Sequence, residues 1–93
     1  DTAWNFGGFN AEAIATVCEK TFQHLKSAPQ RLGLADTPTP ASASLAASYY
    51  PNAEKLADIL CNMLEIDKSR IDYSKLQRKE PVDQPYSSFT GPF

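Results

Sequence analysis

The sequence predicts an α/β fold in which two main helices surround one short strand and an irregular C-terminal tail follows. Apolar residues recur at helical spacing over about residues 10–26 and again over about residues 51–66. Between them, the prolines and glycine of residues 28–40 (Ala-Pro-Gln-Arg-Leu-Gly-Leu-Ala-Asp-Thr-Pro-Thr-Pro) forbid a helix and favour extended chain. Helices around a strand are typical of an α/β layer, but a buried parallel sheet needs several strands. We therefore expect this strand to find its partners outside the chain.

Size and charge narrow the class of protein. The 93 residues make one small domain, near the size at which a single core is only marginally stable. The net charge of −2 comes from interspersed acids and bases, which argues against the basic face of a nucleic-acid-binding protein. No apolar run approaches the roughly 18 residues of a membrane span, and no signal peptide opens the chain. Because the first residue is Asp1 and not Met, we expect a piece of a longer protein.

The sequence has two cysteines, Cys18 and Cys61, and each falls in a predicted helix on or beside its apolar stripe. The favoured interpretation is two buried, reduced thiols in a cytoplasmic protein. A disulfide between the helices is an alternative that requires Cα atoms within about 7 Å. A metal site is less favoured, because no cysteine and histidine stand at ligand spacing.

The first helix follows a glycine turn. Residues 1–9 are predicted to form a loop ending at Gly7 and Gly8, since adjacent glycines allow positive φ and close approach of two elements. Asn10 is the predicted N-cap, and Ser27 and Pro29 stop the helix. Its apolar face comprises Ile14, Val17, Cys18, Phe22 and Leu25. A phosphate cradle is the alternative, but the turn lacks both the three-glycine fingerprint and a phosphate-loop lysine, so close packing is favoured.

Residues 30–34 form the predicted strand, with Leu32 and Leu34 on one face. Gly33 marks a close backbone approach or a bulge. An extended loop over residues 36–40 and a helical turn over residues 41–47 follow. This helical turn is expected to position Leu45, Tyr49 and Tyr50.

The second helix has the cleanest apolar stripe in the chain. Pro51 suits its first turn, Asn52 or Tyr50 lies at its cap, and it fades near residues 65–67. The stripe comprises Leu56, Ile59, Leu60, Met63 and Leu64.

The tail, residues 68–93, is polar and interrupted by prolines. It carries singly spaced apolar residues: Ile71, Tyr73, Leu76, Tyr86, Phe89 and Phe93. Such a tail either is disordered or wraps across a surface with each anchor in a local pocket. The density of aromatic residues favours wrapping.

The candidate catalytic residues do not form a recognisable active site. His24 is the single histidine, and its place near the end of a helix favours capping the helix dipole over acid–base catalysis. Six residues separate it from Cys18, about 600° of helical rotation, so a nucleophile pair fails on geometry. Asp36, Glu54 and Asp58 would meet only through tertiary structure. We expect no catalytic, cofactor-binding or metal-binding residues in this chain.

The order of motifs resembles the C-terminal domain shared by transketolases and the beta subunits of thiamine-diphosphate-dependent 2-oxo acid dehydrogenases. In those beta subunits a glycine-turn helix precedes P-V-x-R-V, then D-x-P-x-P, then a final helix. The matching residues here are Gly8, Ala11, Glu12, Pro29, Arg31, Asp36, Pro38, Pro40 and Pro51. The resemblance covers about residues 1–66. Asn10 replaces the usual second glycine, Leu-Gly-Leu replaces a β-branched strand, and the family's preceding strands are missing.

The resemblance implies a partial three-layer α/β/α, Rossmann-like fold over residues 1–67, with residues 68–93 as an extended tail. It implies an oxidoreductase as the parent enzyme, of pyruvate, branched-chain or acetoin type, which binds thiamine diphosphate and Mg²⁺ upstream of this chain. The expected role is non-catalytic: association with alpha and beta subunits and docking to the acyltransferase core. A free-standing interaction module with a partner-capturing tail is the alternative. A fragment with a single strand leaves exposed helix faces and unpaired strand edges, which predict self-association.

Overall fold

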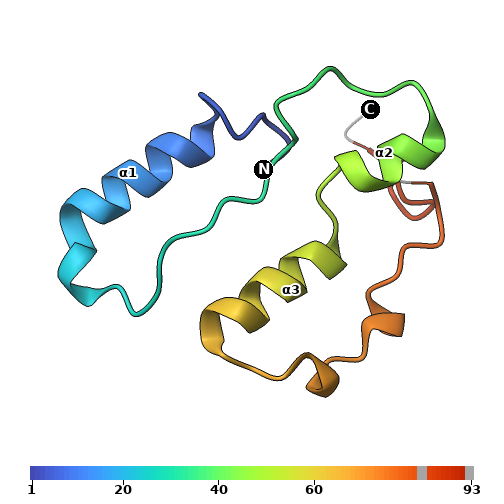
Figure 1. The fold of residues 1–93 in the computed structure, drawn as a ribbon. Coiled ribbons are helices and arrows are strands. Elements are labelled where there is room, and N and C mark those ends of the chain that lie inside the picture. The colour runs from blue at the N-terminus through green and yellow to red at the C-terminus, as the bar shows by residue number, and fades with distance from the viewer. Residues whose placement is uncertain (82–83, 92–93) are drawn as a thin grey trace.

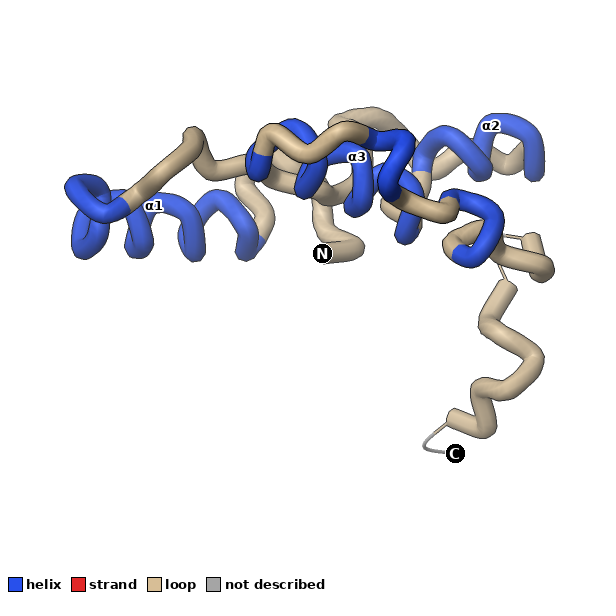
Figure 2. The backbone as a smooth tube through the Cα atoms, turned by 90° about the horizontal axis from the view of Figure 1, so that it is seen from below, coloured by secondary structure: helices blue, strands red, loops and turns tan. Residues whose placement is uncertain are grey.

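The computed structural model describes residues 1–81 and 84–91 as an open, flattened arrangement of helices (Figures 1 and 2). The helices are α1 (Phe9–Thr21), α2 (Ala43–Tyr49) and α3 (Ala53–Leu64), with short 3-10 helices η1 (Phe22–His24), η2 (Lys68–Arg70) and η3 (Tyr73–Lys75). After α1 the chain returns in extended form past the N-terminus and arches over to α2 (Figure 1). No helix in the described ranges combines the length and apolarity needed to cross a bilayer.

Residues 1–5 and 32–34 run side by side as a parallel pair of extended segments, called here the N-terminal pairing. Leu34 N donates to Ala3 O at 2.9 Å, and Asn5 N donates to Leu34 O at 3.2 Å. These bonds create an isolated parallel bridge between Trp4 and Leu34. The Arg31 guanidinium adds a bond to Asn5 O at 2.6 Å. The first residues of the chain, predicted to be a loop, are therefore the partner of the predicted strand.

The strand predicted over residues 30–34 is not formed as a strand in the described part of the chain. Its backbone is extended, but a single bridge does not make a ladder. A strand needs consecutive ladder bonds to a neighbour, and residues 1–5 supply the two bonds of one bridge at Leu34 and a single bond from the Asp1 ammonium to Leu32 O at 3.1 Å. The close approach predicted at Gly33 is confirmed, because a Cβ there would meet Ala3 O at 2.7 Å.

The first helix begins and ends earlier than predicted. Gly8 is the N-cap of α1, and Asn10 lies inside the helix with its side-chain amide donating to Leu32 O at 3.4 Å. Gly8 takes this place because a Cβ would collide with the Trp4 carbonyl, and the positive φ of +69° at Gly7 completes the turn. The α-helix stops at Thr21, where η1 continues only to His24 and Leu25 becomes extended.

The second half of the chain matches the prediction more closely. The helical turn predicted over residues 41–47 is α2, capped by the Ser42 hydroxyl. The cap of α3 is Asn52, whose side-chain oxygen accepts from Lys55 N at 2.9 Å. Pro51 lies before this cap instead of in the first turn. Helix α3 ends at Leu64 with Glu65 in the left-handed conformation at φ 55°.

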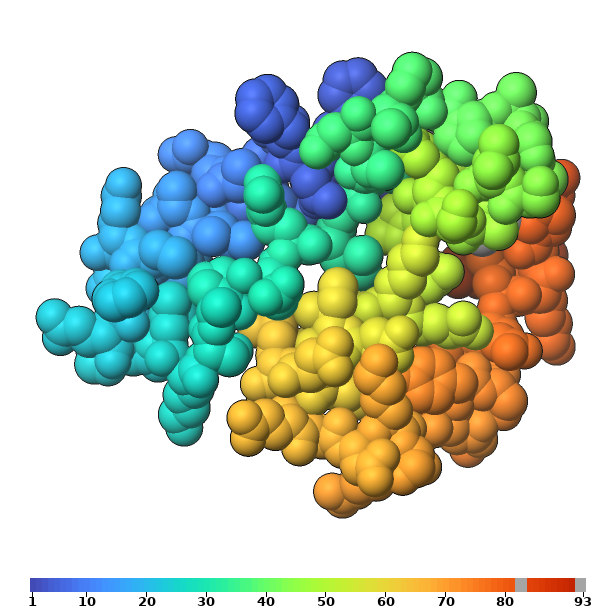
Figure 3. Space-filling view, viewed as in Figure 1, coloured from blue at the N-terminus to red at the C-terminus, as the bar shows by residue number. Residues whose placement is uncertain are grey.

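The described chain has almost no core. Its exposed surface is 7495 Å², about 2,200 Å² more than the ~5,300 Å² expected of a compact monomer of 10.2 kDa. The radius of gyration of 15.6 Å likewise exceeds the value of about 12 Å for a compact domain of this length. Among the described residues, only Ala46, Tyr49 and Cys61 are buried hydrophobic side chains. Figure 3 shows hollows between α3 and the extended segment that comes after α1.

Candidate functional site

The residues that sequence patterns single out for chemistry do not converge. His24 is exposed, Cys18 is half-buried and Cys61 is buried, and both cysteines are free thiols. No hydrogen bond joins His24 to either cysteine in the described part of the chain. Asp36 accepts a hydrogen bond from Phe6 N at 2.9 Å, whereas Asp58 accepts one from Tyr73, so the two carboxylates have separate partners. Residues 1–81 and 84–91 contain no cluster of three histidine, cysteine or carboxylate side chains able to hold a metal ion.

Tyr49 links three parts of the chain through its hydroxyl. The hydroxyl donates to Thr37 O at 3.2 Å and accepts from Trp4 Nε1 at 3.2 Å. Its ring is 7% exposed and meets the Tyr50 ring edge-on, with centroids 5.2 Å apart. The sequence indicates that α2 positions Tyr49, but it gives no sign that Trp4, 45 residues away, is the partner.

Lys55 fixes the corner between α2 and α3. Its ammonium donates to Ser48 O at 2.5 Å and to Tyr50 O at 3.0 Å, where α2 ends. A cation there stabilises the carbonyls left without helical partners. Sequence reasoning missed this role, because one lysine in the first turn of a polar helix face has no distinguishing pattern.

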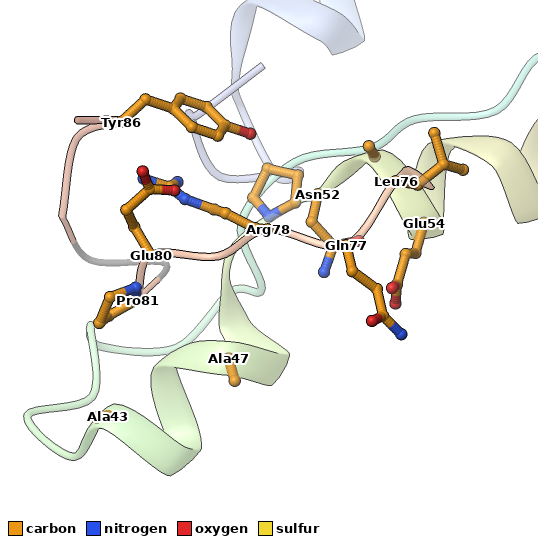
Figure 4. A pocket seen from close by; sticks show the side chains of 12 residues that line it. Ala43, Ala47, Asn52, Glu54, Leu76, Gln77, Arg78, Glu80, Pro81 and Tyr86 are labelled. Atoms are coloured by element: carbon orange, nitrogen blue, oxygen red, sulfur yellow. The ribbon is translucent and has the colours of Figure 1, made fainter. Parts of the chain in front are cut away.

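A cavity of about 490 Å³ lies between α2, the start of α3 and the tail (Figure 4). The Arg78 guanidinium stacks on the Tyr86 ring at 4.2 Å and donates to Gln84 O. Glu80 accepts from Ser87 Oγ at 2.8 Å and Ser87 N at 3.1 Å, and these two bonds hold the pKa of Glu80 below its ordinary value. Both charged groups of the tail therefore serve to fold the tail on itself. The wall also carries Glu54, so the cavity has no net preference for an anion.

A second polar cluster ties the tail to α3. Asp58 Oδ1 accepts from the Tyr73 hydroxyl at 2.6 Å and pairs with Lys68 Nζ at 3.3 Å. The bond from Tyr73, followed by that from Lys68, lowers the pKa of Asp58. The hydrogen bond that the Tyr73 hydroxyl donates to this carboxylate raises the pKa of Tyr73 to about 12, since a phenolate could not donate it. Sequence reasoning considered Asp58 only as part of a carboxylate pair and missed its partners.

These shifts predict a two-sided pH dependence of stability. The lowered pKa of Asp58 stabilises the fold above the unfolded carboxyl value of about 4, and this contribution is lost as pH falls through the folded pKa. The raised pKa of Tyr73 stabilises it below about pH 10, with loss between pH 10 and 12. Urea unfolding of the wild type should therefore show a midpoint that falls at both extremes. Asp58→Asn should flatten both limbs, and identical pH profiles for the two proteins would contradict the assignment.

Apolar side chains are unusually exposed along one face of α3. Leu56, Leu60 and Leu64, called here the leucine stripe, are 47%, 46% and 65% exposed. Their spacing of four residues keeps them on one side of the helix, and Leu56 and Leu60 each lie about 160° around the helix from Asp58. On the N-terminal side of the chain, Trp4, Phe6 and Phe9 are also exposed, Phe6 and Phe9 the most. Exposure of this extent is typical of surfaces that pack against other protein.

These observations describe a small helical unit whose apolar faces are uncovered and whose polar clusters serve structure. Comparison with protein families places it: residues 1–56 match the model described as the transketolase C-terminal domain, and the chain belongs to this family. The resemblance drawn from the glycine turn and the proline-rich segment is thus confirmed. No significant match was found among curated proteins or among solved structures.

Proposed function

We propose that this chain is the C-terminal part of the beta subunit of a thiamine-diphosphate-dependent 2-oxo acid dehydrogenase, of pyruvate, branched-chain or acetoin type. It serves subunit association and docking to the acyltransferase core in the cytoplasm. Family membership supports the proposal. The finer assignment is supported by Pro29 and Arg31 followed by Asp36, Pro38 and Pro40, the order that resembles the beta subunits. Thiamine diphosphate and Mg²⁺ would be held by other parts of the parent enzyme.

The same proposal gives the chain an α/β fold in its parent. The N-terminal pairing has the parallel direction of a βαβ unit, with α1 as the connection between its two extended segments. Gly33 carries no backbone hydrogen bond in the described chain, which leaves one edge of the pairing open. Further strands of the parent would complete the sheet at that edge and cover the helices that flank it.

The observation that carries the proposal is the uncovered surface. The excess of about 2,200 Å² exceeds the ~800 Å² that one partner contributes to a standard interface. A chain with three buried hydrophobic residues in its described part buries little apolar surface and is only marginally stable without a partner. An assembly element, which completes its core against other protein, accounts for this surface.

The test is the association state of the isolated chain. We expect light scattering at micromolar concentrations to give a mass above the 10.2 kDa of the monomer, because association covers the leucine stripe. Replacing Leu56, Leu60 and Leu64 together with glutamine should move the mass toward that of the monomer. Leu45→Gln, which alters an exposed leucine on α2, is the matched control and should leave the mass unchanged. A wild-type chain that stays monomeric throughout would contradict an assembly role for this stripe.

Calorimetric titration with thiamine diphosphate and Mg²⁺ tests the proposal that other parts of the parent enzyme hold the cofactor. We expect no binding to the isolated chain, since its carboxylates make separate local contacts. Micromolar binding would overturn the proposal even if the chain associates.

A free-standing interaction module is the second candidate, and the tail favours it. Tyr86 and Phe89 are 55% and 62% exposed, and this part of the tail extends away from the helices (Figure 2). The wrapping prediction thus holds better for Tyr73 and Leu76, which are half-buried, than for Tyr86 and Phe89. The anchor predicted at Phe93 lies outside the described residues. Deleting residues 84–93 should abolish partner capture by such a module, whereas assembly through the leucine stripe should survive.

A further inference from the structure

Residues 68–76, called here the strap, fold back beside α3 without any backbone hydrogen bond to it. The strap's backbone bonds are local: Ile71 N donates to Lys68 O and Leu76 N to Tyr73 O, as in the two short helices. The side chains of Ile71, Tyr73 and Leu76 are half-buried. The strap is therefore attached through side chains, and its polar attachment to α3 rests on one carboxylate.

Asp58 is that carboxylate. The Tyr73 hydroxyl and the Lys68 ammonium, from the two short helices of the strap, both reach its Oδ1 atom, at 2.6 Å and 3.3 Å. Charge-assisted bonds of this kind are stronger than neutral ones. The Lys75–Asp72 ion pair lies wholly within the strap and adds nothing to its attachment.

Cys61 lies under this attachment. It follows Asp58 by three residues, so both side chains lie on the same face of α3. Its side chain is 4% exposed, and its thiol is near enough to the Tyr73 hydroxyl to help raise the pKa of that group. The tyrosine that bonds Asp58 is thus also part of the cover of the thiol.

We propose that the strap is a releasable cover over Cys61, latched by Asp58. When the latch opens, residues 68–76 lift from α3 and the thiol becomes accessible while the rest of the chain stays folded. The inference is independent of the proposed function, because the strap lies outside residues 1–56 that define the family.

The test measures reaction of Cys61 with the disulfide probe dithiobis(nitrobenzoate), using the full chain with Cys18→Ser so that Cys61 is the sole thiol. The Cys61 thiolate attacks the probe disulfide, forms a mixed disulfide and releases one thionitrobenzoate, whose absorbance gives the rate. At fixed pH we expect Asp58→Ala, which removes both attachments, to react about tenfold faster than its parent. Tyr73→Phe should give a smaller acceleration, and Lys75→Met, the matched control, should give none.

Global destabilisation would also expose the thiol, so the second cysteine serves as a reporter. In the reverse background, Cys61→Ser, the rate at Cys18 on α1 should be unchanged by Asp58→Ala. Equal acceleration at both cysteines would show general unfolding and overturn the proposal. An unchanged rate at Cys61 in Asp58→Ala would overturn it as well, because the strap would then not depend on this carboxylate.

Discussion

Replacing Tyr49 with alanine is expected to unfold the chain at room temperature. Truncating a buried aromatic residue costs about 3–5 kcal/mol, which is comparable to the ~5 kcal/mol total stability at the low end for small domains. The loss is large here because Tyr49 is one of three buried hydrophobic side chains in the described chain and joins α2 to Trp4 and Thr37. Far-UV circular dichroism and the fluorescence of Trp4, the single tryptophan, would report the change.

Tyr49→Phe separates the hydroxyl from the ring. It keeps the packing and loses the bonds to Thr37 O and from Trp4 Nε1, so we expect a loss of about 1–2 kcal/mol in urea unfolding. Tyr50→Phe is the matched control, since the Tyr50 hydroxyl makes no hydrogen bond in the described chain, and its midpoint should stay near the wild type. Equal losses of unfolding free energy in the two variants would show that the hydrogen bonds of the Tyr49 hydroxyl do not stabilise the fold.

Gly33→Ala is expected to break the N-terminal pairing. The new methyl group would lie 2.7 Å from Ala3 O and 2.6 Å from Asn5 Oδ1, so the two segments must separate. Overpacking of this kind costs about 1–3 kcal/mol. The hydrogen exchange rate of the Leu34 amide, which donates to Ala3 O, should rise together with a fall in the urea midpoint.

Gly7→Asn provides the contrast for Gly33→Ala. Gly7 has a φ of +69°, which asparagine tolerates, and a Cβ at this position meets no atom within 4 Å. We expect little change in Leu34 exchange in this variant. Exchange at Leu34 that stays slow in Gly33→Ala would show that the pairing tolerates a side chain at its closest point.

The sequence predicts those elements whose signals are local. Helix α3 combines a capping asparagine with an apolar repeat, and both act within one or two turns. The sequence predicts Asn10 as the N-cap of α1 because asparagine is a favoured capping residue. The N-cap is Gly8 instead, because the Trp4 carbonyl lies too close to this position for any residue with a Cβ. The contact between Trp4 O and Gly8 is a feature of the folded loop, and the capping propensities of single residues do not include it. The strand over residues 30–34 was predicted from a pattern that requires neighbours, and the described chain supplies one bridge.

The functional features divide in the same way. The glycine turn and the proline-rich segment are contiguous motifs, and they sufficed to indicate the family. The Tyr73–Asp58 and Tyr49–Trp4 bonds join residues 15 and 45 positions apart. Single polar residues at such separations carry no periodic signal, so only the three-dimensional structure brings them together.

The N-terminal pairing also has a consequence for how the chain folds. It closes a loop that contains all of α1, since Ala3 and Leu34 are bonded across it. Closing a loop of this length costs chain entropy before any contact compensates it, whereas α2, α3 and the strap form through contacts near in sequence. The second half of the chain should therefore become ordered first. The Trp4–Tyr49 bond then joins the late-forming half to the early one, and the N-terminal pairing is the last part of the chain to become ordered.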